Sequence, residues 1–146
     1  MTAYEVRAYM SQGWKIRREI KAKLNAMEEL RSMAEKTTTT FSLTPSAPQG
    51  NSSRVESYAI RIVEMQEDME ECVNQLVEIQ SRTQHMIELA SDPIQRAVLT
   101  EYHLNGKTAE HTAEEIGYSL RQVWRIMNTA YDEIAEKMSW NGTEVE

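Results

Sequence analysis

The chain has 146 residues, of which 40% are hydrophobic and 27% are charged, so it can form one domain or a small domain with an extended element. Five glycines and three prolines are too few for the many turns of an all-β fold. No apolar run approaches the roughly 18 residues of a membrane span. Cys72 is the only cysteine in the sequence, so the chain cannot form an internal disulfide. The formal net charge of -7 argues against a protein that holds nucleic acid by bulk attraction.

Residues 3–36 are predicted to form one long helix. Apolar side chains recur at spacings of three and four, and no proline interrupts the segment. These apolar positions are Ile16, Ile20, Leu24, Met27 and Leu30. Residues 1–36 carry a charge of +3, which makes this the basic part of the chain.

Residues 37–53, TTTTFSLTPSAPQGNSS, are predicted to form a flexible polar loop. The segment has no charged residue, two prolines, a glycine and a run of β-branched threonines. This composition is typical of a connection between helices.

Residues 54–90 have the clearest periodicity in the chain and carry a charge of -5. Spacings of four and three alternate over about five heptads, which predicts a seam of the coiled-coil kind. The seam is formed by Tyr58, Ile62, Met65, Met69, Cys72, Leu76, Ile79, Thr83, Met86 and Ala90.

The basic first helix and the acidic second helix have similar lengths, so they are expected to pair as an antiparallel hairpin over residues 1–91. One such hairpin buries little area for its length. We therefore expect residues 3–90 to self-associate or to bind a partner; the alternative is a hairpin that folds back on the C-terminal domain.

Residues 92–138 are predicted to form a domain of three helices, followed by a fraying tail at 139–146. Asp92-Pro93 ends the hairpin and starts a helix at about 93–104. Thr108 and Ser119 are expected to cap helices at about 108–116 and 120–138. The overall prediction is an all-α fold, with a long helical hairpin followed by a three-helix domain.

The C-terminal segment AEEIGYSLRQVWRI has the spacing of a helix-turn-helix. A small residue stands where two helices cross, a glycine stands in the turn, and aliphatic residues face the core. The motif core is Ala113, Ile116, Gly117, Val123 and Ile126. Thr112 occupies a position where an aliphatic residue is expected, which should weaken the first helix of the motif.

The segment GKTAEHTAEEIGYSLRQVWRIMNTAYDEI resembles region four of bacterial sigma factors. The order of parts over nearly the whole chain is similar to the late-transcription regulators of RinA and ArpU type from phages and prophages of Gram-positive bacteria. The resemblance implies a DNA-binding regulator in the cytoplasm of a bacterial host cell, with double-stranded DNA and RNA polymerase as partners. An aromatic residue is often found in that family at the position of Ala109 and an aliphatic residue at that of Thr112.

The first two turns of the last helix are expected to enter the major groove, where arginine pairs with guanine and glutamine with adenine. Ser119, Lys107 and Thr108 are placed for phosphate contacts. Asp132, Glu133 and Glu136 would repel phosphates further along. The predicted DNA-binding set is Lys107, Thr108, Ser119, Leu120, Arg121, Gln122, Trp124 and Arg125.

Other interpretations of these residues remain open. Arg121 and Arg125 also fit an ordinary solvated face, and Trp124 also fits a core position against the hairpin. A helix-turn-helix core can serve as a protein-binding module, which would make the chain an adaptor that does not touch DNA. A DNA-packaging protein of the small terminase kind is a further alternative, because it also joins a helix-turn-helix to oligomerising helices.

The sequence gives no support for an enzyme, a cofactor, a metal site or a membrane segment. His85, His103 and His111 have no metal-ligand spacing with one another or with Cys72. The glycines are scattered and form no phosphate loop. His103 is expected at an interface or on the surface.

Overall fold

The protein, described here from a computed structural model, is defined over residues 1–43 and 50–145, with side chains placed for residues 1–37 and 53–140. These residues form helices and no strand, which confirms the predicted all-α fold. The helices are α1 (Ala3–Leu43), α2 (Gly50–Glu88), α3 (Pro93–Leu99), a π-helical turn η1 (Thr100–Leu104), α4 (Ala109–Ile116) and α5 (Leu120–Val145).

The predicted loop at 37–53 is wrong over part of its length. Helix α1 continues through Leu43, and α2 starts at Gly50. Threonine is only a few tenths of a kcal/mol poorer than most residues inside a helix, so a short run does not force a helix to end. The rest of the predicted loop, 44–49, lies outside the described residues.

The chain forms two compact units, Met1–Arg17 with Gln75–Glu146, and Arg18–Asn74. The predicted boundary at residue 91 therefore differs from the observed division. The reason lies in the N-terminal turns of α1, where Val6 and Met10 are fully buried in the core of the first unit. The sequence places these turns in the hairpin, whereas the structure makes them part of the C-terminal core.

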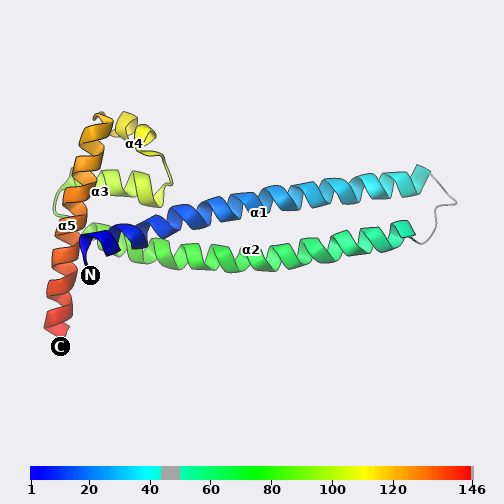
Figure 1. The fold of residues 1–146 in the computed structure, drawn as a ribbon, viewed down its shortest axis with the longest axis horizontal. Helices are drawn as coiled ribbons and strands as arrows, with labels where there is room; N and C mark the ends of the chain where they lie inside the picture. The colour runs from blue at the N-terminus through cyan, green and yellow to red at the C-terminus, as the bar shows by residue number, and fades with distance from the viewer. Residues whose placement is uncertain (44–49, 146) are drawn as a thin grey trace. The chain divides into compact units, whose positions relative to one another are not determined.

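The core of the first unit is formed by residues from α1, the end of α2, α3, α4 and α5 (Figure 1). Helix α5 supplies the largest share because its buried residues recur at helical spacing along one face. The buried α5 residues are Val123, Met127, Ala130, Tyr131, Ile134 and Ala135. Beyond this core α5 remains helical to Val145, so the fraying predicted for the tail at 139–146 is not seen in its backbone; Glu146 lies outside the described residues.

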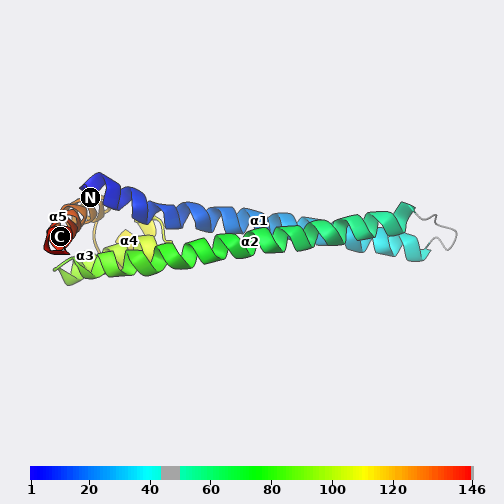
Figure 2. The same ribbon diagram turned by 90° about the horizontal axis from the view of Figure 1, so that it is seen from below.

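In the second unit, the segments of α1 and α2 lie side by side and antiparallel (Figures 1 and 2). Met27 and Cys72 are buried between them, and the Lys23 ammonium lies 2.8 Å from an Asp68 carboxylate oxygen. This hydrogen bond, followed by one to the Cys72 thiol, raises the pKa of Lys23. The expected attraction between a basic α1 and an acidic α2 is thus observed at one ion pair.

The predicted seam of α2 is the less exposed side of this helix in both units. Every seam residue from Tyr58 to Ala90 is buried or half-buried, whereas Ile60, Val63 and Val77 between them are more than half exposed. On α1 the prediction is only partly correct, since Leu24 is 47% exposed although it shares the spacing of buried Met27.

A candidate DNA-binding surface on α5

Helices α4 and α5 are joined by a turn with the backbone geometry that a helix-turn-helix needs. Gly117 has φ of +83° and ends α4, and its N–H donates to the Ala113 carbonyl oxygen at 2.9 Å. This left-handed conformation suits glycine because other residues carry a Cβ that is strained there. Ala113 and Val123 are buried on either side of the turn, while Ile116 and Ile126 are half-buried. The predicted motif core thus occupies the positions expected from its spacing.

Both predicted caps are formed. The Thr108 hydroxyl accepts a hydrogen bond from the His111 N–H at 3.1 Å and caps α4. The Ser119 hydroxyl accepts from the Gln122 N–H at 3.2 Å, and the Gln122 side-chain oxygen accepts from the Ser119 N–H at 2.9 Å. This reciprocal pair is a capping box, and the local signal for it is the Ser-x-x-Gln pattern at residues 119–122.

Thr112 does not disturb α4 in the way the sequence suggested. The side chain is fully buried, and its hydroxyl donates to the Thr108 carbonyl oxygen at 2.9 Å. A buried hydroxyl with a partner costs little, whereas an unpaired one would cost about 1–3 kcal/mol. Threonine therefore takes the place of the expected aliphatic residue with its polar group satisfied.

Arg17 of α1 contacts the turn that leads into α4. The Arg17 guanidinium donates to the Leu104 carbonyl oxygen, and the Gln80 amide donates to the same oxygen at 3.3 Å. Gly106 has φ of +71°, and a Cβ at this position would lie 3.1 Å from Cδ of Arg17. Nothing in the sequence pointed to this contact, because Arg17 and Leu104 are 87 residues apart.

Residues of the predicted DNA-binding set fall into two groups. Lys107 and Trp124 are half-buried and contact other side chains of the unit, and the hydroxyls of Thr108 and Ser119 act as helix caps. The exposed members at the start of α5 are Leu120, Arg121, Gln122 and Arg125.

Lys107 is held by two carboxylates. Its ammonium lies 2.5 Å from Glu101 and 3.2 Å from Glu115, and the hydrogen bond to Glu101, then that to Glu115, raises its pKa. A phosphate that contacts Lys107 would have to compete with these two carboxylates.

Trp124 packs within the first unit. Its ring lies 5.9 Å from the Tyr102 ring, centroid to centroid, and 5.8 Å from the Arg7 guanidinium carbon. This half-buried side chain belongs with the core, as in the alternative drawn from the sequence, and we remove it from the contact surface.

Arg121 and Arg125 are different from most other cations of the first unit. Arg96 and Lys137 donate to backbone carbonyls at 2.7 and 2.8 Å, and Arg82 lies 4.8 Å from the Tyr9 ring centroid. Neither Arg121 nor Arg125 makes an ion pair or side-chain hydrogen bond within residues 1–37 and 53–140. They are four residues apart, so both point outward from the same face of the first two turns of α5.

Acidic residues bound this surface on the C-terminal side. Asp132 and Glu136 are exposed further along α5. Glu133 accepts a hydrogen bond from the Ser91 N–H at 3.0 Å and pairs with Lys137 at 3.0 Å; these two contacts, that with Ser91 first, lower its pKa. Among the side chains of α5 described up to Trp140, those of the first two turns therefore carry positive charge without a neighbouring carboxylate on the same helix.

His103 is buried, contrary to the expectation of a surface or interface residue. Its Nε2 lies 2.6 Å from the Tyr131 hydroxyl, and the ring makes an edge contact with Tyr102 at 4.8 Å between centroids. Burial chiefly, and the nearby Arg7 charge, lower the pKa of His103 to about 4, and burial raises the pKa of Tyr131. The pair is a polar contact within the core.

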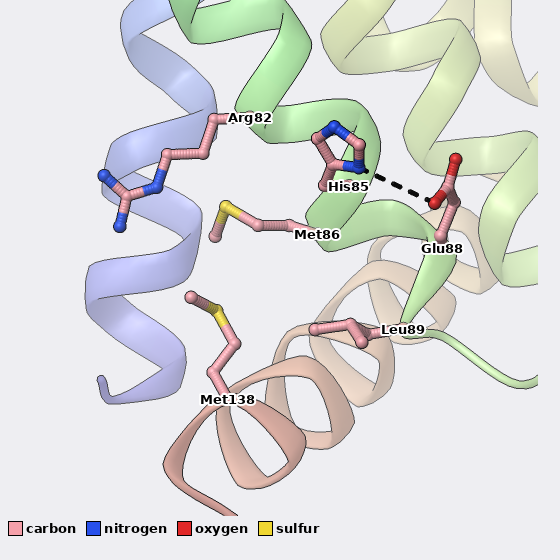
Figure 3. A pocket seen from close by; sticks show the side chains of 6 residues that line it. All are labelled: Arg82, His85, Met86, Glu88, Leu89 and Met138. Atoms are coloured by element: carbon pink, nitrogen blue, oxygen red, sulfur yellow. Dashed lines mark ion pairs between the residues drawn. The ribbon is translucent and has the colours of Figure 1, made fainter. Parts of the chain in front are cut away.

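A separate hollow in the first unit lies beside the C-terminal part of α5 (Figure 3). Met86, Leu89 and Met138 give it an apolar wall, and His85 lies 3.8 Å from Glu88 at its edge. Both partners are more than half exposed, so their interaction is weakened by water. Within the described part of the chain, no group of three metal-ligating side chains comes together.

Among the residues that the structure describes, no helix has the length and apolar character needed to cross a membrane. Comparison with known proteins found no matching family model, no curated relative and no solved structure similar to this chain.

Proposed function

We propose that the protein is a sequence-specific DNA-binding regulator of transcription, of the phage or prophage kind that its resemblance to sigma region four suggests. In this proposal the first two turns of α5 enter the major groove of double-stranded DNA. The supporting observation is the exposed, unpaired pair Arg121 and Arg125, which extends from a helix-turn-helix whose turn and caps are formed. Arginine at such positions binds the O6 and N7 atoms of guanine.

The capping box limits what Gln122 can do. Its side-chain oxygen is already bonded to the Ser119 N–H. The side-chain amide nitrogen remains able to donate to a base or a phosphate. We therefore assign base recognition first to the two arginines, and to Gln122 as a donor, with Leu120 contacting a thymine methyl group.

A net charge of -7, with two unpaired arginines at the start of α5, implies weak binding by the chain alone. We propose that RNA polymerase holds the protein near a promoter, and that the hairpin at 3–90 binds a partner. In this function the protein acts in the cytoplasm of a bacterial host and performs no catalysis.

The test is selection of bound duplexes from a random DNA pool, with and without bacterial RNA polymerase, at two salt concentrations. We expect an enriched sequence with wild-type protein and none with Arg121→Ala/Arg125→Ala. Lys15→Ala is the matched control because it removes an exposed cation from α1 of the same unit.

No enrichment under any condition would contradict DNA recognition. Enrichment that survives in the double variant would assign it to another surface. If the protein is instead an adaptor that does not bind DNA, the double variant should keep its full function in the host cell. If it is a packaging protein, it should form a ring-sized assembly in solution.

A further inference from the structure

The outward side of α2 in the second unit carries a second heptad-spaced stripe. Its members follow one another at spacings of four, three, four, three and four, so they share one face of the helix. The stripe consists of Glu56, Ile60, Val63, Glu67, Glu70 and Asn74. All six are exposed, and Ile60 and Val63 are 59% and 51% exposed.

Ile60 and Val63 give this stripe a small apolar centre flanked by acidic side chains. The first seam of α2 is already occupied by α1 through contacts such as Cys72 with Lys23. The second stripe therefore has no helix of the described chain against it. Its acidic members, Glu56, Glu67 and Glu70, make no ion pair among the described side chains.

Helix α1 of the same unit carries a stripe of the opposite character. Lys21, Leu24, Glu28 and Arg31 follow one another at spacings of three, four and three. They line one side of a hollow of about 480 Å³, and Met27 and Met69 contribute apolar surface to it. Leu24 is 47% exposed, and neither Lys21 nor Arg31 has an ionic partner among the described residues.

We propose that the hairpin assembles with a second copy of this chain, in which the outer stripe of α2 from one copy packs into the hollow beside α1 of the other. Ile60 and Val63 of one copy cover Leu24 of the other. Lys21 and Arg31 lie on opposite sides of Leu24, and Glu56 and Glu67 lie on opposite sides of the aliphatic pair, so each cation faces one of these two carboxylates across the contact. A second copy is the occupant that the chain itself specifies, because one unit carries both halves of this complementarity.

Opposite charges across such a contact select the partner and its orientation more than they add affinity. The aliphatic residues supply the driving force, since burying apolar surface contributes about 25 cal/mol per Å². This inference rests on the partner-binding role proposed for the hairpin and requires no contact between α5 and DNA.

The experiment is sedimentation of the full chain over a range of protein concentrations. We expect wild-type protein to associate, and Lys21→Glu/Arg31→Glu and Glu56→Lys/Glu67→Lys each to sediment as monomers. Like charges then face each other in every self-contact. A mixture of the two variants restores opposite charges and should associate again.

Glu29→Lys is the control, because Glu29 is exposed on α1 outside the stripe and should leave association unchanged. Circular dichroism of each variant, matched to the wild type, shows that the hairpin remains folded. A monomeric wild type, or variants that associate as the wild type does, would overturn the inference. A mixture that stays monomeric after both variants have dissociated would assign the surface to a different partner and equally overturn it. DNA selection on these same variants reports separately on α5.

Discussion

At the scale of the residue, His103 gives the fold a defined response to acid. Its pKa is lowered from 6.5 to about 4, so below pH 6.5 the unfolded chain binds a proton that the folded chain excludes. Stability contributed by the neutral ring is present above pH 6.5 and is lost as the pH falls toward 4. The full effect is about 3 kcal/mol, since one pKa unit corresponds to about 1.4 kcal/mol.

His103→Gln removes the titrating group while keeping a polar side chain near Tyr131. We expect its free energy of unfolding to fall less between pH 7 and pH 4.5 than that of the wild type. Urea unfolding at several pH values measures this difference. Equal pH dependence in the two proteins would show that His103 is not the responsible group.

At the scale of the element, two glycines have opposite roles in their helices. Gly117 ends α4 with a left-handed backbone and has open space around it. Gly117→Ala should therefore lower the free energy of unfolding by about 1–2 kcal/mol through backbone strain alone. Gly13 lies inside α1, and a Cβ there would meet Ile79 and Leu76 at 3.8 Å, an ordinary contact. Gly13→Ala should therefore raise the free energy of unfolding by about 0.5–1 kcal/mol. Chemical denaturation of both variants checks the opposite signs, and two changes of equal sign would contradict this account.

The sequence predicts a structural element well when the residues that determine it lie close together in the chain. The seam of α2, the Thr108 and Ser119 caps and the Gly117 turn all depend on residues within one or two helical turns. The reach of α1 through Leu43 was missed, because helix propensity alone sets a boundary poorly. At Thr112 the residue type suggested a weakness, whereas a hydroxyl bond to the preceding turn removes it.

At the scale of the whole molecule, the first turns of α1 complete the C-terminal core. Met10→Ala should destabilise the protein by about 2–5 kcal/mol, because Met10 is 1% exposed and its removal leaves a cavity. Met33→Ala, at a 41% exposed position of the same helix, should change stability by less than about 0.5 kcal/mol. Thermal unfolding of the two variants gives the comparison, and equal melting temperatures would restore the boundary predicted at residue 91.

Long-range packing explains why the candidate site was predicted only in part. Exposure of Arg121 and Arg125 followed from helical spacing alone. The partners that hold Lys107 and Trp124, Glu101 and Arg7 among them, come from other elements and leave no local pattern. Val6 and Met10 likewise had no signal that distinguished them from hairpin residues.

The π-helical turn η1 has a consequence for the history of the chain. The Asn105 N–H bonds to the Thr100 carbonyl oxygen, five residues back, which is how an α-helix accommodates one inserted residue. A shorter ancestor or cousin lacking one residue between Leu99 and Asn105 would carry an unbroken helix there. Because the bulge absorbs the extra residue, side chains beyond it keep their orientation in both chains, and the difference is confined to residues 100–104, where the histidine meets Tyr131. The buried His103–Tyr131 contact and this one-residue insertion should therefore be gained or lost together.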